Sequence, residues 1–480
     1  MAYRAAEALG LAVLLACCLL LAVPAAAHAA LSSCYSGGDT SWYDDSKTTF
    51  TLDSANELAG LAQLVTLEGK TFRGKTVKIG RDMDLSSVTG GKSWLPIGHS
   101  AHGSALFQGT FDGQGHILKN LRVDCDMYEV ALFGGTRDAT IRNFTLTGTV
   151  KGTVDVAGVV AVCSNTNLED IVCDVDVTAE DDYNGRAGGV VGYAMTTQDS
   201  HNTYRNLVNK GTVSGHGAKV GGVFGFLGTT GSATVVQCAN TGNVTSQVTF
   251  GKSNQTDASY GVGGVIGSTT GEYGSFTIAE CFNSGKVSSN YMQSIGGIAG
   301  YLGGMSTSLT SCYNDGQVSG SKNAGGIAGY FGSQGGTLSA TYNKGKVSGS
   351  QVGGTLGNAS NAGQTLAHNF SHDVLSGDAA RAYGDSVQAS NAGTSLSTDQ
   401  IRSQNLLDLL NGYGDFFDWD DPTKTDDPAN DGYLYLKWQN LQKGRPNGNP
   451  GGNEDGSGES DGDGDKPGDG IPDKYQVVVN

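Results

Sequence analysis

The sequence has little proline, few aromatic residues and little charge: 8 prolines in 480 residues, 8% aromatic and 16% charged residues. The scarcity of proline excludes a collagen-like chain and a proline-rich disordered one. No second long apolar run follows the one near the N-terminus, so we expect no membrane-spanning helix in the remainder. Basic residues number 30 against 47 acidic ones and form no basic patch, which argues against nucleic acid as a partner.

Glycine is abundant, at 75 residues, and much of it lies in a repeated motif of the type GGVVG or GGIAG. Six copies begin at Gly188, Gly221, Gly263, Gly296, Gly325 and Gly353, and weaker copies begin at Val130 and Ala157. A second motif, Asn-x-Gly-x-Val, begins at Asn209, Asn240, Asn283, Asn314 and Asn343. Two motifs that recur in a fixed order predict a solenoid, because each unit must bury its apolar side against the next.

Each repeat unit contains short extended segments and lacks the apolar spacing of a helix. In one unit these segments are residues 295–302, 309–313 and 317–318. The units are also too short to hold a crossover helix. We therefore predict an all-β fold: a right-handed parallel β-helix, a solenoid of about ten coils with three short strands per coil, with helical end caps. The polar stretches 180–186 and 246–259 should leave the coil as loops.

Equivalent positions of successive units should stack. The valines that end the second motif would form a ladder in the interior: Val213, Val244, Val287, Val318 and Val347. The asparagines of the motif would stack likewise, with their side-chain amides bonding coil to coil. We attribute the Asn-x-Gly sequence itself to a sharp turn, since asparagine tolerates left-handed backbone conformations and glycine adopts positive φ without steric cost.

Nine cysteines are present, of which Cys17 and Cys18 lie in the N-terminal apolar run. Three of the other seven stand two residues before a repeated asparagine, in the slot that Leu and Thr fill in neighbouring units: Cys238, Cys281 and Cys312, beside Leu207 and Thr341. Such a slot predicts an inward core position, where thiols act as small hydrophobes. Neighbouring coils lie about 4.8 Å apart, so a disulfide between Cys281 and Cys312 stays open.

The N-terminus has the features of a signal peptide. Arg4 precedes an apolar run over residues 9–23, and Ala27-His28-Ala29 matches a cleavage signal. The run is shorter than the roughly 20 residues of a spanning helix. A lipid-attachment site at Cys17 is disfavoured because the apolar run continues past it. We predict cleavage after Ala29 and a secreted or cell-surface protein that does not span the membrane after cleavage.

The open strand edges at both ends of a solenoid require caps. Residues 54–57 form a capping box before an apolar-periodic helix, and residues 397–400 open a second helix that ends at Asn411-Gly412. A final extended piece, residues 433–438, is expected to return to the sheet.

These signals divide the chain into six parts. They are a signal peptide (1–29), an N-terminal segment with a capping helix (30–69), the parallel β-helix with its repeats (70–396), a C-terminal cap of helix and final strand (397–443), an acidic Gly/Asp-rich linker (444–474), and the start of a truncated or following module (475–480).

The VGGIAGY-type segments followed by CYN-x-G-x-V resemble the GLUG motif of bacterial cell-surface proteins. Residues 58–64, 78–85, 94–98 and 107–116 resemble the lead-in of these proteins, and 431–439 resembles their closing segment. The resemblance implies a secreted or wall-associated right-handed β-helix, commonly one module of a larger surface protein, and no single activity. The motif also accompanies metallo-endopeptidases that cleave immunoglobulin A. Their zinc signature HExxH is absent from this sequence, so that activity is not carried over.

One constellation favours an enzyme that acts on acidic polysaccharides. Gly215-His216-Gly217, with Asp181-Asp182 upstream and Lys219 after it, is similar to the set of paired aspartates, GHG and basic residue in pectin hydrolases. Such chemistry needs two carboxylates on neighbouring coils, one to protonate the leaving oxygen and one to activate water. The same slot is an ordinary repeat turn in other units, however, so a turn that happens to contain histidine is the simpler interpretation.

Two further patterns have the spacing of metal ligands. The pairs His99/His102 and His368/His372 have no clear third ligand, and we interpret them as surface histidines. Carboxylates at positions 1, 3, 5, 9 and 13 of a short acidic loop suit Ca²⁺, and they belong to Asp461, Asp463, Asp465, Asp469 and Asp473. Lys466 and Pro472 replace the usual glycine and the bidentate glutamate of such a loop, so a solvated acidic linker is the alternative. No other cofactor is expected.

The sequence assembles no catalytic set, and its body is built of repeats. We therefore expect a non-enzymatic, exported surface protein, an adhesin-like module for binding or display whose partner is a host or bacterial surface glycan or protein. A polysaccharide lyase or hydrolase that uses the β-helix groove is the first alternative. A mechanical spacer of a larger surface protein is the second.

Overall fold

The structure is a computed structural model. It describes residues 34–99, 106–125, 127–181, 185–217, 219–247, 260–271, 273–291, 294–360, 363–372, 394–419 and 432–439. The predicted signal peptide, linker and following module lie outside these residues, and so do residues 248–259 of the second predicted loop.

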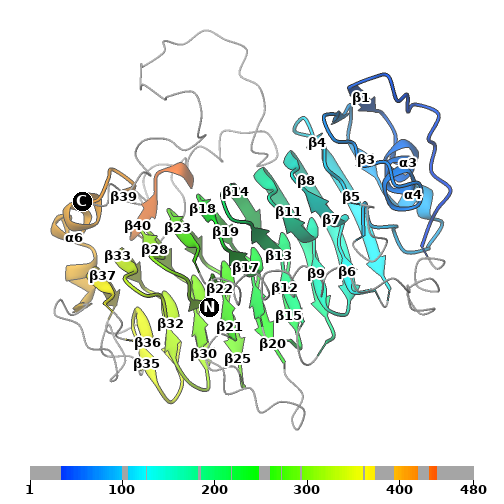
Figure 1. The fold of residues 1–480 in the computed structure, drawn as a ribbon. Helices are drawn as coiled ribbons and strands as arrows, with labels where there is room; N and C mark the ends of the chain where they lie inside the picture. The colour runs from blue at the N-terminus through cyan, green and yellow to red at the C-terminus, as the bar shows by residue number, and fades with distance from the viewer. Residues whose placement is uncertain are drawn as a thin grey trace, which may run out of the picture.

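The chain forms a parallel β-solenoid of about ten turns, as the repeats predicted, and 52% of the described residues lie in strands (Figure 1). Three parallel sheets run along it. The large sheet contains 22 strands: β1 (Thr49–Leu52), β2 (Thr76–Ile79), β3 (Met83–Asp84), β4 (Thr110–Asp112), β5 (Ile117–Asp124), β8 (Thr140–Gly152), β11 (Asn167–Ala179), β14 (His201–Asn209), β15 (Val213–Gly215), β18 (Ser232–Val236), β19 (Ala239–Asn240), β20 (Val244–Ser246), β23 (Ser275–Ala279), β24 (Phe282–Asn283), β25 (Val287–Ser289), β28 (Ser308–Thr310), β29 (Tyr313–Asn314), β30 (Val318–Gly320), β33 (Thr337–Asn343), β34 (Val347–Ser348), β37 (Thr365–His372) and β38 (Thr394–Leu396).

Two further sheets of eight strands each flank every glycine corner. The sheet before the corner, here called the leading sheet, contains β6 (Glu129–Val130), β9 (Asp155–Ala157), β12 (Arg186–Gly188), β16 (Lys219–Gly221), β21 (Gly261–Gly263), β26 (Ser294–Gly296), β31 (Ala324–Gly325) and β35 (Val352–Gly353). The sheet after the corner, the trailing sheet, contains β7 (Phe133–Arg137), β10 (Val160–Ser164), β13 (Val191–Thr196), β17 (Phe224–Thr229), β22 (Ile266–Thr270), β27 (Ala299–Leu302), β32 (Ala328–Phe331) and β36 (Leu356–Ala359).

The strand boundaries within a coil differ from the prediction at the glycine motif. We expected residues 295–302 to form one extended segment, but the chain turns between Gly296 and Ala299, and the segment is divided into β26 and β27. All eight sequence copies of the motif lie at such a corner, between one leading and one trailing strand. The motif therefore marks a change of sheet, not the middle of a strand.

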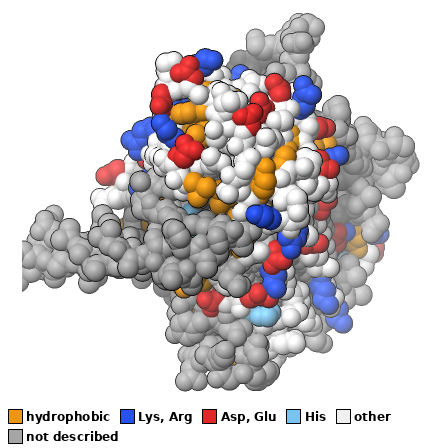
Figure 2. All heavy atoms as spheres, turned by 90° about the vertical axis from the view of Figure 1, so that its right-hand side faces the viewer, with side chains coloured by type: hydrophobic (Ala, Val, Ile, Leu, Met, Phe, Trp, Pro, Cys, Tyr) orange, Lys and Arg blue, Asp and Glu red, His pale blue; other side chains and the backbone are white. Residues whose placement is uncertain are grey.

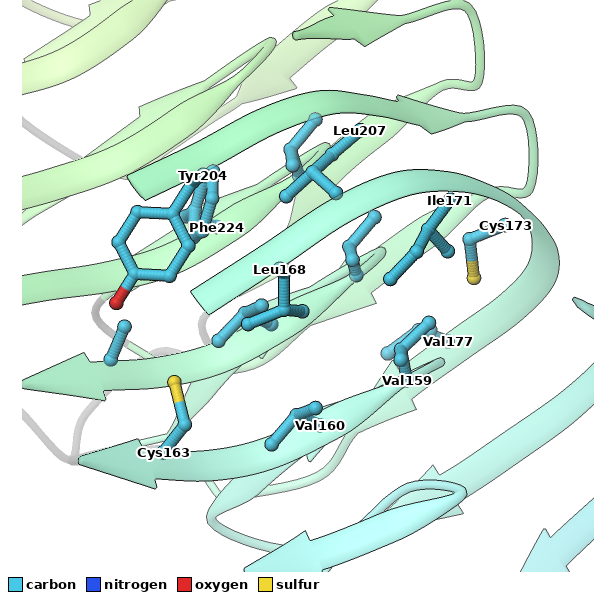
Figure 3. Close-up of a cluster of buried hydrophobic side chains, with 14 of the residues drawn as sticks. Val159, Val160, Cys163, Leu168, Ile171, Cys173, Val177, Tyr204, Leu207 and Phe224 are labelled. Carbon is cyan, nitrogen blue, oxygen red and sulfur yellow. The ribbon is translucent and has the colours of Figure 1, made fainter. Parts of the chain in front are cut away.

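The core consists of ladders of apolar side chains in exact parallel register. One ladder takes one buried residue from each of eleven successive coils: Phe50, Val77, Phe111, Ile141, Leu168, Tyr204, Val235, Ile278, Leu309, Leu338 and Leu366. The predicted valine ladder is confirmed, because Val213, Val244, Val287, Val318 and Val347 pair coil to coil and are at most 1% exposed. Figure 3 shows such side chains filling the space between the sheets, with Leu168 and Ile171 of β11 and Val160 of β10 pointing into it.

The predicted asparagine ladder is confirmed too. The Nδ2 atom of each asparagine donates to Oδ1 of the next, at 2.7 or 2.8 Å, from Asn209 through Asn240, Asn283 and Asn314 to Asn343. Each Nδ2 also donates to the carbonyl oxygen of the glycine two residues later. All five side chains are fully buried, so these hydrogen bonds satisfy polar groups that water cannot reach.

Our explanation of the Asn-x-Gly sequence was wrong. Neither the asparagines nor the glycines of this motif have positive φ. The glycines are required by close packing: a Cβ atom on Gly285 would lie 1.9 Å from the carbonyl oxygen of Gly242 on the preceding coil. The second glycine of the corner motif meets the same constraint, since a Cβ on Gly264 would lie 2.4 Å from Cγ of Asn283. The two sequence motifs are therefore in contact in space.

Helix α3 (Ala55–Thr66) lies at the N-terminal end of the stack (Figure 1), as the capping box predicted. Ser54 Oγ accepts a hydrogen bond from Glu57 N, and Glu57 reaches back to the backbone N–H of Asp53. Leu58 and Leu61 are fully buried in the main core. The strand β1 before the helix already pairs with β2, so the parallel sheet begins ahead of residue 70.

Figure 2 shows this end of the molecule, where acidic and basic side chains lie interspersed among small apolar groups. A short helix, α4 (Ser86–Thr89), follows β3.

The predicted second helix is present as two pieces, α5 (Thr398–Ile401), which begins with a full capping box, and α6 (Gln404–Asn411), which Ser403 caps. The prediction that the last strand returns to the sheet is wrong. Strand β40 (Leu434–Leu436) pairs antiparallel with β39 (Phe417–Trp419) in a separate two-stranded sheet. Residues 394–419 and 432–439 are called the C-terminal segment below.

The C-terminal segment packs against the outward side of the large sheet. There an in-register row, called the flank ladder, is formed by Val172, Val208, Ala239, Phe282, Tyr313, Tyr342 and Phe370. Phe282, Tyr313 and Tyr342 stack with ring centroids 5.2–5.3 Å apart. Trp438 Nε1 donates to the Glu280 carbonyl oxygen at 2.9 Å, and Tyr342 donates to the carbonyl oxygen of Leu434. These contacts cover apolar surface on several coils, which explains why β40 lies against the outward side of the large sheet.

The cysteine slot is an inward core position, as predicted. Cys238, Cys281 and Cys312 are fully buried, like Leu207 and Thr341 in neighbouring coils. No disulfide joins any two of the seven described cysteines. Cys281 N donates to Cys312 Sγ at 3.3 Å.

Candidate functional site

A row of charged residues lies on the leading sheet at one repeat position. Glu129, Asp155, Arg186 and Lys219 are paired in register on four consecutive coils. The next residue along each strand, such as Val156 or Val220, points into the core and is fully buried, so the charged side chains point outward. We call this row the charged ladder.

The centre of the charged ladder is a buried ion pair. Arg186 binds both carboxylate oxygens of Asp155, with Nη2 to Oδ2 at 2.9 Å, and the Asp155 residue is 5% exposed. Burial raises the pKa of Asp155 to about 7, against the opposing effect of the Arg186 charge, and Glu129 on the neighbouring coil raises it further. A carboxylate of this kind changes its charge near neutral pH.

A row of rings lies beside the charged ladder, on the outward side of the trailing sheet. Four aromatic residues occupy one register position, Tyr193, Phe226, Tyr301 and Tyr330, and the buried Ser268 interrupts the row between Phe226 and Tyr301. Tyr193 and Phe226 have centroids 5.3 Å apart, and Tyr301 and Tyr330 stack at 5.7 Å. The three tyrosines are half-buried, so part of each ring surface is accessible. We call this row the ring ladder.

The two ladders meet through cation–π contacts. The guanidinium carbon of Arg186 lies 4.0 Å from the ring centroid of Tyr193. Lys219 Nζ lies 4.9 Å from the Phe226 centroid and 4.7 Å from the Tyr260 centroid. Such contacts hold long cationic side chains in one geometry, and they strengthen as water is excluded.

Glycines explain why the ladders are so close. A Cβ on Gly225 of the trailing sheet would lie 2.9 Å from the carbonyl oxygen of Ala187 on the leading sheet, so the two backbones are in direct contact. Further along the trailing strands, the Tyr301 ring lies over Gly303 and Gly332, where added Cβ atoms would come within 2.6 Å of its atoms. The Tyr301 ring therefore lies flat against the sheet, over these two glycines.

This arrangement favours binding over acid–base chemistry. Glu129 and Asp155 are neighbouring carboxylates, as a glycosidase requires, but they are only 8% and 5% exposed, and Asp155 is held by Arg186. The half-buried rings of Tyr301 and Tyr330, in contrast, present apolar surface to solvent, and the third half-buried ring, Tyr193, lies against the Arg186 cation. That combination suits a ligand with both apolar faces and polar edges.

Two of the residues that the sequence suggested for catalysis lie on neighbouring coils. His216 lies in the turn between β15 and β16, where its backbone N–H donates to the Ala179 carbonyl oxygen. Asp181 follows β11, which pairs with β15, and Asp182 lies outside the described residues. Lys219 belongs to the charged ladder and is packed between two rings.

The predicted metal residues give no metal centre in the described part of the chain. The five aspartates of the Ca²⁺ loop, and His102, lie outside it. The interpretation of the histidines as surface residues was wrong for His99 and His372, which are 3% and 2% exposed, although His368 is exposed. No group of three or more His, Cys, Asp or Glu side chains within the described ranges could hold a metal ion. The helices of those ranges include none that is long and apolar enough to cross a membrane.

Both ladders have a signal in the sequence at a fixed distance from the corner motif, which the separate motifs did not reveal. Asp155, Arg186 and Lys219 each stand three residues before the second residue of the corner motif, and the ring position stands four residues after it. Aligning the repeats in columns shows charge at one position and rings at the other.

No family model matches the sequence. A stretch of 151 residues, 30% of this chain, is 32% identical to part of halomucin from Haloquadratum walsbyi (strain DSM 16790 / HBSQ001), and spans 2% of the length of that protein. A crystal structure of a protein proposed to be an immunoglobulin A1 protease, from Bacteroides ovatus, is 15% identical and covers 82% of this chain and 94% of its own, with a TM-score of 0.34. The topology described above therefore defines the class of this protein: a parallel β-solenoid.

Proposed function

We propose that this protein is an exported surface protein that binds an extended glycan along the ring ladder without catalysing a reaction. The observation that carries the proposal is the pair of adjacent ladders: half-buried tyrosines in register on the trailing sheet, with Arg186 and Lys219 packed against the first two rings. Export is supported by the signal-peptide pattern of residues 1–29 and by the resemblance to GLUG-motif surface proteins.

The chemistry of sugars supports a glycan as ligand. A pyranose ring has a face of C–H groups that packs on an aromatic ring, and hydroxyl groups at its edge that bond to polar side chains. The coils repeat at about 4.8 Å, so a ladder offers equivalent contacts to successive units of a polymer. A protein ligand with a flat surface would not require rings at one repeated position. The net charge of −17 disfavours binding of a polyanionic ligand, except beside Arg186 and Lys219.

A polysaccharide lyase or hydrolase is the second candidate. It is favoured by the placement of Glu129 and Asp155 on neighbouring coils and by the pKa of Asp155, which burial raises to about 7. A general acid with such a pKa would be half protonated at neutral pH. The burial of both carboxylates disfavours this candidate, since the leaving oxygen of a substrate must reach them.

One experiment separates the candidates. The purified protein is applied to a glycan array, and binding to the best ligand is then measured by calorimetry for wild type, Tyr301→Ala, Tyr330→Ala and a matched control, Tyr273→Ala, whose ring is 73% exposed and lies outside the ladder. We expect each ladder variant to lose about tenfold in affinity and the control to lose nothing.

The same ligands are incubated with the protein and assayed for new reducing ends and for unsaturated products. Product formation that Asp155→Asn abolishes would establish the enzyme instead. Absence of any glycan binding, with no product, would contradict both and leave the mechanical spacer.

A further inference from the structure

Two histidines of strand β37 contact the C-terminal segment. His368 Nδ1 lies 2.8 Å from the Tyr413 hydroxyl oxygen, and His372 Nε2 lies 3.1 Å from Thr398 Oγ1. Strand β37 lies at the C-terminal end of the stack (Figure 1), and α5 packs against it. In the sequence the spacing of the two histidines resembled that of metal ligands, but in the structure both side chains bind hydroxyl groups of the segment.

The surroundings of the two histidines differ. His368 is exposed, so water can solvate a charge on its ring. The hydroxyl oxygen of Tyr413 can accept a hydrogen bond from a protonated ring, so this contact survives a change of charge. His372 is 2% exposed, and a charge on its ring would be shielded from water.

Three side chains that can carry a positive charge surround Tyr433 of the C-terminal segment. Lys344 Nζ lies 4.7 Å from the Tyr433 ring centroid, and the guanidinium carbon of Arg402 lies 4.3 Å from it. The ring centroid of His372 lies 6.2 Å from the same point. Lys344 also occupies the repeat position of His372 one coil earlier. A proton on His372 would therefore add a third positive charge to this cluster.

Two carboxylates belong to the same surroundings, while β38, which pairs with β37, contains no charged residue. Asp315 Oδ1 lies 3.2 Å from Lys344 Nζ and compensates the charge of that lysine. Asp399 of α5 is exposed, so solvent screens its charge. The Arg402 charge and the burial of His372 remain, and both oppose protonation of the imidazole while the segment is attached.

We propose that His372 is an acid-sensitive latch for the C-terminal segment. Above about pH 6.5, where a free imidazole is neutral, His372 is hydrogen-bonded to Thr398 and the segment stays attached. At lower pH, detachment lets His372 take up a proton in water, so the stability of the attachment is lost as the pH falls. Detachment would uncover the stacked rings of Phe282, Tyr313 and Tyr342, an aromatic surface that the segment covers at neutral pH.

The test is hydrogen exchange of the full chain between about pH 8 and about pH 5, corrected for the pH dependence of the intrinsic exchange rate. We expect the protection of β39 and β40 against exchange to fall below about pH 6.5. The fall should reach up to about tenfold per pH unit, because detachment takes up one proton. The valine ladder reports the stability of the whole solenoid and should stay protected.

Three variants assign the effect to His372. His372→Gln can still bond to Thr398 but takes up no proton, so β39 and β40 should stay protected at low pH. The matched control His368→Gln, on the same strand, should keep the pH dependence of the wild type. Arg402→Gln removes an exposed cation beside Tyr433, and it should make the loss of protection between about pH 8 and about pH 5 smaller.

Wild-type protection of β39 and β40 that does not change with pH would overturn the latch, and so would an equal fall in wild type and His372→Gln. If His372→Gln does not fold, the wild-type and Arg402→Gln profiles decide, because an undiminished loss in Arg402→Gln contradicts the role of the cations. Either result leaves glycan binding along the ring ladder intact, since that ladder belongs to the trailing sheet.

Discussion

Asn240 donates from its side-chain Nδ2 atom to Oδ1 of Asn283 at 2.7 Å, although 43 residues separate them in the chain. This is the longest interval between repeats, because residues 246–259 are inserted in that coil. The neighbouring link from Asn209 to Asn240 spans 31 residues and has the same length, 2.7 Å. The asparagine ladder therefore keeps its register although the length of chain between successive asparagines differs.

The asparagine ladder predicts a graded loss of stability. Asn283→Ala removes three buried hydrogen bonds, those with Asn240 Nδ2, Asn314 Oδ1 and the Gly285 carbonyl oxygen, so we expect a loss of about 3 kcal/mol or more in the free energy of unfolding. Asn209→Ala should cost less, because Oδ1 of Asn209 accepts no hydrogen bond. Urea denaturation measures both. Equal losses for the two variants would show that the ladder does not act as a chain of buried hydrogen bonds.

The corner glycines predict a steric effect that differs between positions. A Cβ at Gly264 would lie 2.0 Å from the carbonyl oxygen of Gly297, so Gly264→Ala should prevent the coil from closing and give a chain that aggregates or unfolds. At Gly228, on the same face of the solenoid, the nearest atom would be a flexible ring carbon of Phe226 at 3.4 Å, and Gly228→Ala should fold. Circular dichroism and gel filtration distinguish the outcomes. A folded Gly264→Ala variant would refute the close packing of the corner on the asparagine ladder.

The sequence predicted what repeats: the coil, the inward valines, the buried cysteine slot and the asparagine stack. These features depend on short patterns that occur in every unit. The structural reason for the glycines was predicted wrongly, because a positive φ and a close backbone approach both require glycine. The two reasons are distinguished only by the structure, in which Gly285 packs against the Gly242 carbonyl oxygen of the preceding coil. The place of the last strand was also missed, since nothing in residues 433–438 indicates a partner at Glu280.

The candidate site was less predictable, because its residues differ from coil to coil. Asp155 and Arg186 occupy the same position before the corner motif in consecutive units but differ in residue type, and register places them side by side. The sequence favoured a repeat turn at His216 over a catalytic set, and His216 does lie in the turn between β15 and β16.

The buried ion pair predicts a pH dependence of stability. The pKa of Asp155 is about 7 in the folded chain against an ordinary value of 3.8. Its contribution to stability is therefore fully present below about pH 4 and is lost as the pH rises through about 7, a change on the order of a few kcal/mol. Asp155→Asn should flatten the profile of unfolding free energy between pH 4 and 8, and Asp408→Asn, at an exposed position, should not. A wild-type profile that rises across this window would contradict the assignment.

The C-terminal segment predicts a local effect. Trp438→Ala removes a side chain that is 5% exposed, the hydrogen bond to Glu280 and the contact with the Phe282 ring, whose centroid is 5.7 Å away, and should weaken the attachment of the segment by about 3–5 kcal/mol. Hydrogen exchange should then rise in β39, β40 and the flank ladder, while the valine ladder stays protected. Trp419→Ala, at a half-buried position, is the control. A uniform rise across all coils would show that the segment is part of the solenoid itself.

The central claim is that successive coils lie in register, and pairwise crosslinking tests it most directly. Thr245 and Ser288 are register partners on consecutive coils, with hydroxyl oxygens 3.4 Å apart, and Ser319 lies one coil further along the same row. The account predicts that Thr245→Cys with Ser288→Cys forms a disulfide readily under mild oxidation, while Thr245→Cys with Ser319→Cys does not. Equal crosslinking of both pairs, or of the second pair alone, would contradict it.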